Sequence, residues 1–559
     1  MMTTMLNFTT NMLNLRIIIL VFLLTYSCSK TSQKPLNVVW ISCEDMGPIL
    51  GSYGNDRIKT PNLDKLAAEG VRYTNAYSTA GVCAPSRFSI ITGMYSARLG
   101  AHNMRTGDYH NYKTPEEVTY RSNIGVLDKA GKNIPEYEVV TPEYVKPFTE
   151  ILRKEGYYCA NNFKCDYQFN APFTAWDEVS STVSFRDAPK DKPFFYVWNT
   201  LLTHESRIWE RKNEPLTVLP EDVIIPSYFP DIPEVRNDIA RKYSNIEAMD
   251  KKVGELINQL EEDGLLGNTI IMFWSDHGGN LLRQKRAVGN SGLNVPLIIR
   301  YPNKQNAGKV DDRIVSLMDL GPTVLSLLNI ESPDHFDGKA IAGKFEKEPR
   351  KYAFGTADRF DESTDMQRSV LDGRYVYIKN FMPELPLIYR NNYRERITMN
   401  SKLIEMDSKG KLDGDAAYIF MKSKPIEEFY DLHNDPYEVN NIINNPEHSQ
   451  RINDFRNALA HWQLKINDQG FKPENEIVRL FWPNMIQPKT NNVEFNITGS
   501  GLYELTSLTN GASIGYQIDE KIGSKSWDLY HQPIIIPDNK KIVARAIRIG
   551  YAASDITSN

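Results

Sequence analysis

The stretch from Asn37 to Cys43, NVVWISC, is a short, mostly apolar run of strand-forming residues that ends directly before Glu44 and Asp45. A short apolar run of this composition favours a buried strand. The two acids then follow at the carboxyl end of that strand. This segment therefore predicts a buried strand with carboxylates at its tip.

Similar runs recur along the chain. Thr269 to Trp274 is followed closely by Asp276 and His277, and further runs are found at Phe194 to Trp198 and at Val295 to Arg300. Each has the length and composition of a buried strand. The acid Asp276 is thus expected at the end of a second strand, as Glu44 and Asp45 are at the end of the first.

Helical patterns lie between these runs, with apolar residues at steps of three and four. One long amphipathic helix is closed by Gly264, and a shorter one is ended by Gly70. The apolar positions are Ile239, Tyr243, Ile246, Met249, Val253, Leu256, Ile257 and Leu260 in the first, and Leu63, Leu66, Ala67 and Val71 in the second. Strands that alternate with helices predict an α/β fold: a mostly parallel central sheet flanked by helices, with ligands at the carboxyl ends of its strands.

The chain of 559 residues is too long for one ordinary domain. We expect a large α/β domain over residues 28–343 and a smaller α+β subdomain over 344–469, with a strand at Tyr375 to Ile378 and a helix near Ile452 to Leu464. Residues 470–559 are expected to form a β-sandwich-like appended module, because short alternating runs separated by turns begin after Phe471. These runs are Val493 to Ile497, Ile514 to Ile518 and Lys541 to Ile549.

The N-terminal segment indicates export. The apolar run Ile17 to Leu24 follows Arg16 and is too short to cross a bilayer, so residues 1–27 are predicted to be a signal peptide. Cys28 then resembles the lipidated cysteine of a bacterial lipoprotein, which implies a periplasmic or surface-anchored protein of a Gram-negative bacterium. A plain secretory signal is the alternative. The membrane is expected as a partner only through this lipid anchor.

Composition limits the classes of function. A formal net charge of −5, with 41% hydrophobic and 24% charged residues, describes a globular protein without the basic surplus of a nucleic-acid-binding protein. Five cysteines are a small and odd count, which argues against a disulfide framework. Whether Cys159 and Cys165 pair stays open at this stage, because a disulfide needs a geometry that sequence does not give.

The chemistry is indicated by the run Gly81-Val82-Cys83-Ala84-Pro85-Ser86-Arg87, which is followed by Phe88 to Thr92 and Gly93. This run resembles the signature of the sulfatase family, CxPSR followed by an apolar stretch and TG. The resemblance implies the alkaline phosphatase/sulfatase-like fold and the oxidation of Cys83 to formylglycine (3-oxoalanine) by a formylglycine-generating or sulfatase-maturing enzyme. The alternative is a purely structural role, in which Cys83 is a buried cysteine at the start of a helix.

The resemblance covers residues 37 to about 441 and implies a calcium site. Glu44 and Asp45 match the acids that bind calcium after the first strand, although the family's usual pair is two aspartates. Asp276 and His277 match the second metal motif, with Cys83 as a further ligand after its conversion. Calcium prefers oxygen ligands, so His277 is chemically the weakest of the five, and the alternative for it is a supporting or core histidine.

The family pattern also implies groups for sulfate and for the leaving alcohol. Lys164 and Lys285 match the two lysines that hold the sulfate, and His204 matches the histidine that serves the leaving group. Arg87 belongs to the signature itself. Asp166 stands where many relatives carry a histidine, so the group that assists sulfate release is open.

The substrate is expected to be a sulfated carbohydrate. His102, Asn103 and Arg105 follow the signature in a stretch that resembles the substrate pocket of carbohydrate sulfatases, and Arg286 is a further candidate contact. The pattern resembles bacterial polysaccharide sulfatases and the heparan N-sulfatase type, with ulvan first among the substrates that this implies. Two other hypotheses stay open: a phosphonate monoester or phosphodiester hydrolase, and a non-catalytic glycan-binding protein.

Overall fold

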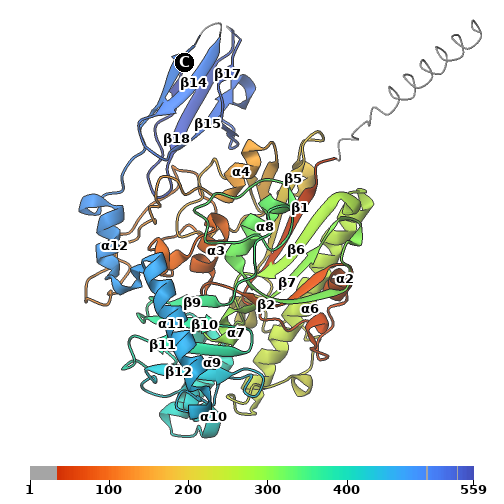
Figure 1. The fold of residues 1–559 in the computed structure, drawn as a ribbon, viewed down its shortest axis with the longest axis vertical. Coiled ribbons are helices and arrows are strands. Elements are labelled where there is room, and N and C mark those ends of the chain that lie inside the picture. The colour runs from red at the N-terminus through yellow and green to blue at the C-terminus, as the bar shows by residue number, and fades with distance from the viewer. Residues whose placement is uncertain (1–33, 499–500, 538) are drawn as a thin grey trace, which may run out of the picture. The chain divides into compact units, whose positions relative to one another are not determined.

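An eight-stranded sheet forms the centre of the fold (Figure 1). The computed structural model describes residues 34–498, 501–537 and 539–559, so the predicted signal peptide and Cys28 lie outside the described residues. The strand order is β4-β3-β5-β1-β6-β7-β2-β8, in which β7 runs antiparallel to both neighbours and every other pair is parallel. The strands are β1 (Asn37–Cys43), β2 (Val71–Tyr77), β3 (Tyr158–Asn161), β4 (Glu178–Val179), β5 (Phe194–Thr200), β6 (Thr269–Ser275), β7 (Asn294–Arg300) and β8 (Lys309–Ser316). The predicted mostly parallel sheet is confirmed.

Helices cover both faces of this sheet. Alternate residues of β1 point to opposite sides, with Val38 and Trp40 in one hydrophobic core and Val39 and Ile41 in the other. The first core is closed by α3 (Cys83–Thr92), α4 (Phe148–Lys154) and α8 (Leu320–Leu327). The second is closed mainly by α2 (Pro61–Ala68), α5 (Ser206–Glu210) and the long α6 (Pro233–Glu262). Burial on both faces explains why β1 reads as a continuous apolar run.

The two predicted helices need one correction. The long helix is α6, and Gly264 follows it with a φ of +68°, as expected for a glycine that ends a helix. The shorter helix, α2, ends at Ala68, and Val71 is the first residue of β2 and not part of the helix. Gly70 lies between them, where a Cβ would meet the carbonyl oxygen of Ile299 at 2.5 Å, so this turn needs glycine.

A second, antiparallel sheet follows in the order β12-β11-β10-β9. Its strands are β9 (Ala353–Ala357), β10 (Gln367–Leu371), β11 (Tyr375–Asn380) and β12 (Glu427–Asp431). The helices of this region are α9 (Thr398–Ser408), α10 (Gly414–Ile419) and α11 (Ser449–Ile466), and the short α7 (Asn290–Leu293) precedes β7. The predicted strand and helix of this region are thus found as β11 and α11, which share one core.

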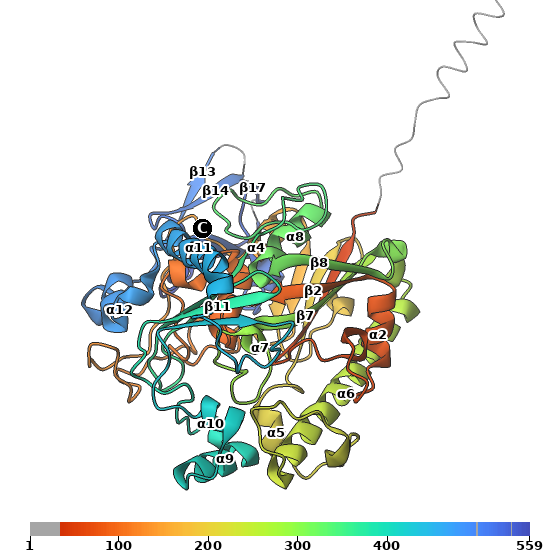
Figure 2. The same ribbon diagram turned by 60° about the horizontal axis from the view of Figure 1, so that its bottom comes forward.

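Helices α9 and α10 extend this region towards α6 (Figure 2). The backbone N–H of Met399 donates to the Asp238 carboxylate of α6 at 2.6 Å. Met399, Leu403 and Ile419 belong to the hydrophobic core that α6 closes. The second sheet and its helices are therefore packed directly against the catalytic α/β layer.

The C-terminal region begins with a helix that the sequence analysis did not predict. Residues Glu474–Phe481 form helix α12, where short alternating β runs were expected from Phe471 onward. Ile477 and Val478 of this helix are buried, and its Glu474 forms an ion pair with the buried Arg359. Two small antiparallel sheets follow, β13-β14-β17 and β16-β15-β18-β19. Their strands are β13 (Val493–Ile497), β14 (Leu502–Ser507), β15 (Ser513–Ile518), β16 (Asp528–Leu529), β17 (Ile534–Ile535), β18 (Ile542–Ile547) and β19 (Thr557–Ser558).

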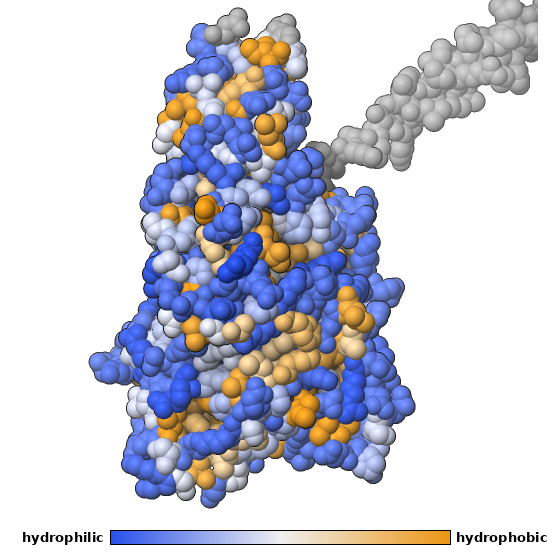
Figure 3. Space-filling view, turned by 90° about the vertical axis from the view of Figure 1, so that its left-hand side faces the viewer, coloured by the Kyte–Doolittle hydropathy of each residue, from blue (hydrophilic) through white to orange (hydrophobic). Residues whose placement is uncertain are grey.

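On the face shown in Figure 3, hydrophobic side chains form separate patches among hydrophilic ones. Among the described residues, no helix is both long and apolar enough to cross a membrane. Cys159 and Cys165 are both buried and free, so they do not pair.

Candidate active site

The predicted site residues meet at the carboxyl ends of four neighbouring strands, β3, β5, β1 and β6. Glu44 and Asp45 follow β1, Asp276 and His277 follow β6, His204 follows β5, and Lys164 follows β3. This is the edge at which sheets of this class bind their ligands. The sheet topology thus brings together residues that lie more than 200 positions apart in the sequence.

Cys83 lies at the first position of α3, with its thiol in the centre of the cluster. Sγ is 3.5 Å from His277 Nε2, 3.6 Å from Glu44 Oε2 and 3.9 Å from both Asp45 Oδ1 and Lys285 Nζ. The residue is only 1% exposed. A helix N-terminus favours negative charge, so an anion bound beside Cys83 gains from the dipole of α3.

Arg87 holds two of the acids together. Its guanidinium donates to Glu44 and, at 3.0 Å, to Asp276 Oδ2, and it also bonds Ser42 and Asn199 at the ends of β1 and β5. Burial alone would lower the pKa of Arg87, but Glu44 and Asp276 outweigh this effect and raise it. With all these bonds made inside the protein, Arg87 fixes the geometry of the acids as well as adding positive charge.

The two predicted sulfate-binding lysines face the centre from opposite sides. Lys164 Nζ lies 2.6 Å from Glu44 Oε2, and Lys285 Nζ lies 2.7 Å from Asp45 Oδ2. Burial opposes their charge, but Cys83 and Glu44 raise the pKa of Lys164, and Asp45 and Cys83 raise that of Lys285. Both lysines therefore remain protonated and can bind an anion.

His204 lies beside Lys285, with His204 Nε2 3.3 Å from Nζ. Its other ring nitrogen, Nδ1, is 3.1 Å from Ser206 Oγ. Burial, followed by the charge of Lys285, lowers the pKa of His204 to about 4. At neutral pH Lys285 thus donates to a neutral ring, and the two side chains together hold the proton that a leaving alkoxide needs.

Glu205 is a site residue that the sequence analysis missed. Its carboxylate is 3.2 Å from Lys285 Nζ and accepts two hydrogen bonds from Arg286, at 2.9 and 3.0 Å. Its backbone N–H donates to Asp45 Oδ2 at 2.7 Å. Arg286 and Lys285 lower the pKa of Glu205 to about 2 against the effect of burial. The signal available in the sequence was its position next to His204.

The four candidate substrate contacts are placed differently from one another. His102 and Asn103 are buried, and Asn103 accepts a hydrogen bond from the backbone of Arg359. Arg286 lies in the wall of the site, where Glu205 and Asp361 engage its guanidinium. Of the four, Arg105 alone has an exposed side chain.

Asp166 lies at the edge of the cluster, and its carboxylate is 3.5 Å from Lys164 Nζ. It has a φ of +56°, in the left-handed region that non-glycine residues rarely adopt. Asp45 also has a positive φ, of +49°. Such strained positions gather at functional sites, because the surrounding structure must hold them in place.

The donor set fits a hard divalent cation. Ligand atoms of Asp45, Cys83, Asp276 and His277 lie within 4.8 Å of one another, and Glu44 joins Asp45, Cys83 and His204 in an overlapping group. Three carboxylates supply the oxygens that calcium prefers, whereas His277 supplies nitrogen. Arg87, Lys164 and Lys285 balance the charges of Glu44, Asp45 and Asp276, so a bound divalent cation would leave a net positive site for an anion.

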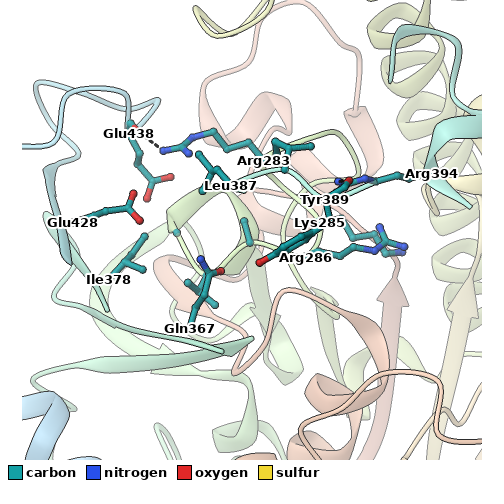
Figure 4. Close-up of a pocket in the computed structure, with 14 residues that line it drawn as sticks. Arg283, Lys285, Arg286, Gln367, Ile378, Leu387, Tyr389, Arg394, Glu428 and Glu438 are labelled. Atoms are coloured by element: carbon teal, nitrogen blue, oxygen red, sulfur yellow. Dashed lines mark hydrogen bonds between the residues drawn. The ribbon is translucent and has the colours of Figure 1, made fainter. Parts of the chain in front are cut away.

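A small, partly open cavity lies next to the loop that carries Lys285 and Arg286 (Figure 4). Its volume is about 40 Å³, which is enough for water but not for a sugar. Gln367, Ile378 and Glu428 of the second sheet line its other side. The cavity therefore marks where the second sheet packs against the catalytic loop, and it is not the substrate site.

The fold and the site together define a class: a hydrolase of anionic esters, built on a mostly parallel α/β sheet, whose reactive group lies at a helix N-terminus next to a cluster of carboxylates and fixed positive charges. Comparison with known proteins narrows this class. Residues 36–330 match the family model described as Sulfatase. The chain is 38% identical to an ulvan-active sulfatase of Formosa agariphila over 94% of this chain and 91% of that protein.

Two further comparisons agree. The human N-sulphoglucosamine sulphohydrolase is 26% identical, over 78% of this chain and 91% of that protein. A crystal structure of a putative sulfatase from Bacteroides thetaiotaomicron shares the fold, with a TM-score of 0.56 at 19% identity, over 79% of this chain and 95% of that one. The chain belongs to the sulfatase family and is a sulfuric ester hydrolase.

Proposed function

We propose that this sulfatase removes sulfate from a sulfated polysaccharide or its oligosaccharides, with ulvan as the first candidate, and that it uses a formylglycine formed from Cys83 and a bound calcium ion. The observation that carries the chemistry is the environment of Cys83. A buried thiol surrounded by two carboxylates, an imidazole and an ammonium group is poorly matched to its neighbours. A hydrated aldehyde, with its two hydroxyls, suits these partners much better. The choice of ulvan is supported by the 38% identical relative.

The residues of the site supply what hydrolysis of a sulfate ester needs. When bound, calcium neutralises sulfate oxygens, and hydrated formylglycine supplies the attacking hydroxyl. Lys164 and Lys285 bind the remaining sulfate oxygens as preorganised charges. Asp276, held by Arg87, takes the proton of the attacking hydroxyl. Lys285, which donates to Nε2 of the neutral His204 ring, supplies the proton that His204 passes to the departing sugar oxygen.

The calcium ligands in this proposal are Glu44, Asp45, Asp276, His277 and the converted Cys83. Glu44 has a longer side chain than the aspartate usual at this position, and both of its oxygens already bond cations, Oε1 to Arg87 and Oε2 to Lys164. Binding of the metal therefore requires that Lys164 share or release Oε2. That release frees the ammonium group for the sulfate.

The proposal includes a partner and a location. Because Cys83 is 1% exposed at the start of a fully buried helix, a maturing enzyme must reach it before the chain has folded. We also propose that the protein is exported to the periplasm or the cell surface and is anchored through a lipid on Cys28. The test of this part is the mass of the N-terminal peptide from the native host.

Two measurements test the proposed chemistry and substrate. The mass of the tryptic peptide that contains Cys83 should show conversion to formylglycine in protein from a host with a maturing enzyme. The same preparation should release sulfate from ulvan oligosaccharides, while the Cys83→Ala variant should not. Full activity from protein with an intact Cys83 thiol would contradict the mechanism, and release from other sulfated glycans but not ulvan would contradict the substrate.

A further inference from the structure

A chain of alternating charges leads away from the reaction centre. Lys285 contacts Glu205, Glu205 contacts Arg286 at 2.9 Å, Arg286 contacts Asp361 at 2.7 Å, and Asp361 accepts a hydrogen bond from Arg105. Three cations and two carboxylates alternate along this chain. Both carboxylates are shared between two cations, and Lys285 also pairs with Asp45 at 2.7 Å.

Only Arg105, at the outer end of this series of ion pairs, is open to solvent. The side chains of Glu205, Arg286 and Asp361 are buried, whereas that of Arg105 is 48% exposed. Within the described ranges, the guanidinium of Arg105 has one hydrogen bond, from Nε to Asp361. Its two terminal amino groups are thus free to donate to a ligand.

The backbone conformation indicates that the position of Arg105 is held by the surrounding structure. Arg105, Arg286 and Asp361 have φ values of +59°, +73° and +55°. Each lies in the left-handed region, which costs free energy for a residue with a Cβ and persists only where the surroundings hold it. Three neighbouring members of one ion-pair chain share this conformation. The fold therefore fixes the backbone of Arg105, and the bond to the buried Asp361 sets the position of its guanidinium.

That position is on the side of the leaving group. The guanidinium carbon of Arg105 lies 5.0 Å from the centre of the Tyr393 ring, and the Tyr393 ring lies 6.3 Å from the ring of His204. Trp209 packs edge-on against Tyr393 at 5.0 Å. Arg105 thus lies within one or two sugar rings of the oxygen that His204 protonates.

The surrounding charge also favours an anion. Arg394, which follows Tyr393, is buried and donates to the carbonyl oxygen of Tyr389. Figure 4 shows its guanidinium at the same end of the cavity as that of Arg286. In the described part of the chain Arg394 has no direct ion pair with a carboxylate; burial and the charge of Arg286 lower its pKa to about 10, against the smaller opposing effects of Glu205 and Asp361.

We propose that Arg105 binds a second anionic group of the saccharide, a carboxylate or a further sulfate, on the sugar that carries the scissile sulfate or on its neighbour. This inference rests on the proposed function and adds a specificity-determining residue to it. A guanidinium with two free amino groups matches the two oxygens of either anion in a forked geometry. The enzyme thereby prefers sulfated saccharides that also carry a uronic acid or a second sulfate close to the cleaved ester.

The test compares matched substrates. Wild-type enzyme and Arg105→Gln are assayed on a sulfated oligosaccharide with a uronic acid next to the sulfated sugar, on its carboxyl-reduced derivative, and on the corresponding pair with and without a second sulfate. Loss of a charge-assisted hydrogen bond predicts that wild-type kcat/KM is about 10- to 100-fold higher for the member of one pair with the extra anion. In Arg105→Gln this ratio should fall to about one, and Arg105→Lys should restore part of it.

A matched control is available elsewhere on the surface. The side chain of Arg186 is 47% exposed and, like Arg105, pairs with an aspartate: it donates to Asp263 through Nε and Nη2. Arg186→Gln should keep the wild-type ratio for both substrate pairs. An Arg105→Gln variant that lowers kcat/KM equally for both members of each pair, or a wild-type enzyme without preference in either pair, overturns the proposal.

Binding separates this inference from the proposed function. The same four saccharides are titrated against the Cys83→Ser variant by calorimetry, with and without Arg105→Gln, which measures affinity without turnover. An affinity ratio that disappears with Arg105→Gln supports the anion subsite even where turnover fails, and that combination would count against the proposed function alone. Equal affinities for the paired saccharides overturn the subsite.

Discussion

Replacement of His204 by alanine gives the sharpest test of how the leaving group is served. His204 follows β5 and places Nε2 3.3 Å from Lys285 Nζ, while Lys164 lies on the other side of the cluster beside Glu44. The two residues therefore have separable tasks. His204→Ala removes the proton donor for the sugar oxygen, and Lys164→Ala removes a charge that faces the sulfate.

The expected magnitude depends on the alcohol that leaves. A positioned general acid contributes about 100- to 10,000-fold, which corresponds to about 3 to 5 kcal/mol of barrier. A sugar alkoxide is a poor leaving group, so His204→Ala should lose this full factor on a sugar sulfate. A phenolate departs without a proton, so the loss on an aryl sulfate should be less than about tenfold. Lys164→Ala should lower kcat/KM on both substrates by similar factors, because both present the same sulfate group.

The assay measures sulfate release by both variants from a sulfated oligosaccharide and from 4-nitrophenyl sulfate under identical conditions. His461→Ala, a histidine on the exposed face of α11, serves as the control and should behave as wild type on both. Equal losses for His204→Ala on the two substrates would remove His204 from the role of acid. A loss for Lys164→Ala on the sugar sulfate alone would show that this lysine acts on the leaving group and not on the sulfate.

Three further results are expected. Asp276→Ala should lose bound calcium and activity together, as measured by elemental analysis and sulfate release. The control Asp311→Ala, on edge strand β8, should keep its calcium. An Asp276→Ala protein that retains both calcium and activity would exclude the site. Glu474→Gln breaks a buried two-bond ion pair with Arg359, so the free energy of unfolding in urea should fall by about 3 to 5 kcal/mol, and a change below about 1 kcal/mol would show that α12 does not depend on this pair. Burial raises the pKa of the Glu138 carboxyl from 4.5 to about 7, so its protonated form stabilises the fold fully below about pH 4.5 and this stability is lost as the pH rises through about 7. Glu138→Gln should therefore raise the midpoint of thermal unfolding, relative to wild type, more at about pH 8 than at about pH 5, and an equal difference at both pH values would contradict this assignment.

Local sequence was enough for the architecture of the catalytic layer. NVVWISC reads as a strand buried on both faces because both of its faces meet a hydrophobic core, and the apolar steps of α6 fit the one face that it buries. The meeting of the acids that follow β1 and β6 could also be predicted, because neighbouring parallel strands place their carboxyl ends at the same edge of the sheet. The resemblance of the segment around Cys83 then supplied the family, which the comparisons confirmed.

Prediction of secondary structure from the sequence was less accurate in short segments whose apolar residues show no clear helical or strand spacing. Val71 was assigned to a helix although it begins β2, because one apolar residue after Gly70 fits either element. Residues Glu474–Phe481 were expected to lie in a β-rich region, yet they form α12. The buried pair of Glu474 with Arg359 stabilises that helix, and the partner lies 115 positions away.

The sequence by itself thus determined strands β1, β5, β6 and β7 of the central sheet, the long helix and the reactive motif, since each depends on neighbours within a few positions. Only the tertiary structure decided which distant side chains complete the site. Glu205 gains its role from bonds to Lys285 and Arg286, and Asp361 reaches Arg105 and Arg286 from the loop between β9 and β10. Such contacts leave no periodic pattern, because the charge of a buried side chain is set by partners that the folded chain brings within about 3 Å, whatever their separation in sequence.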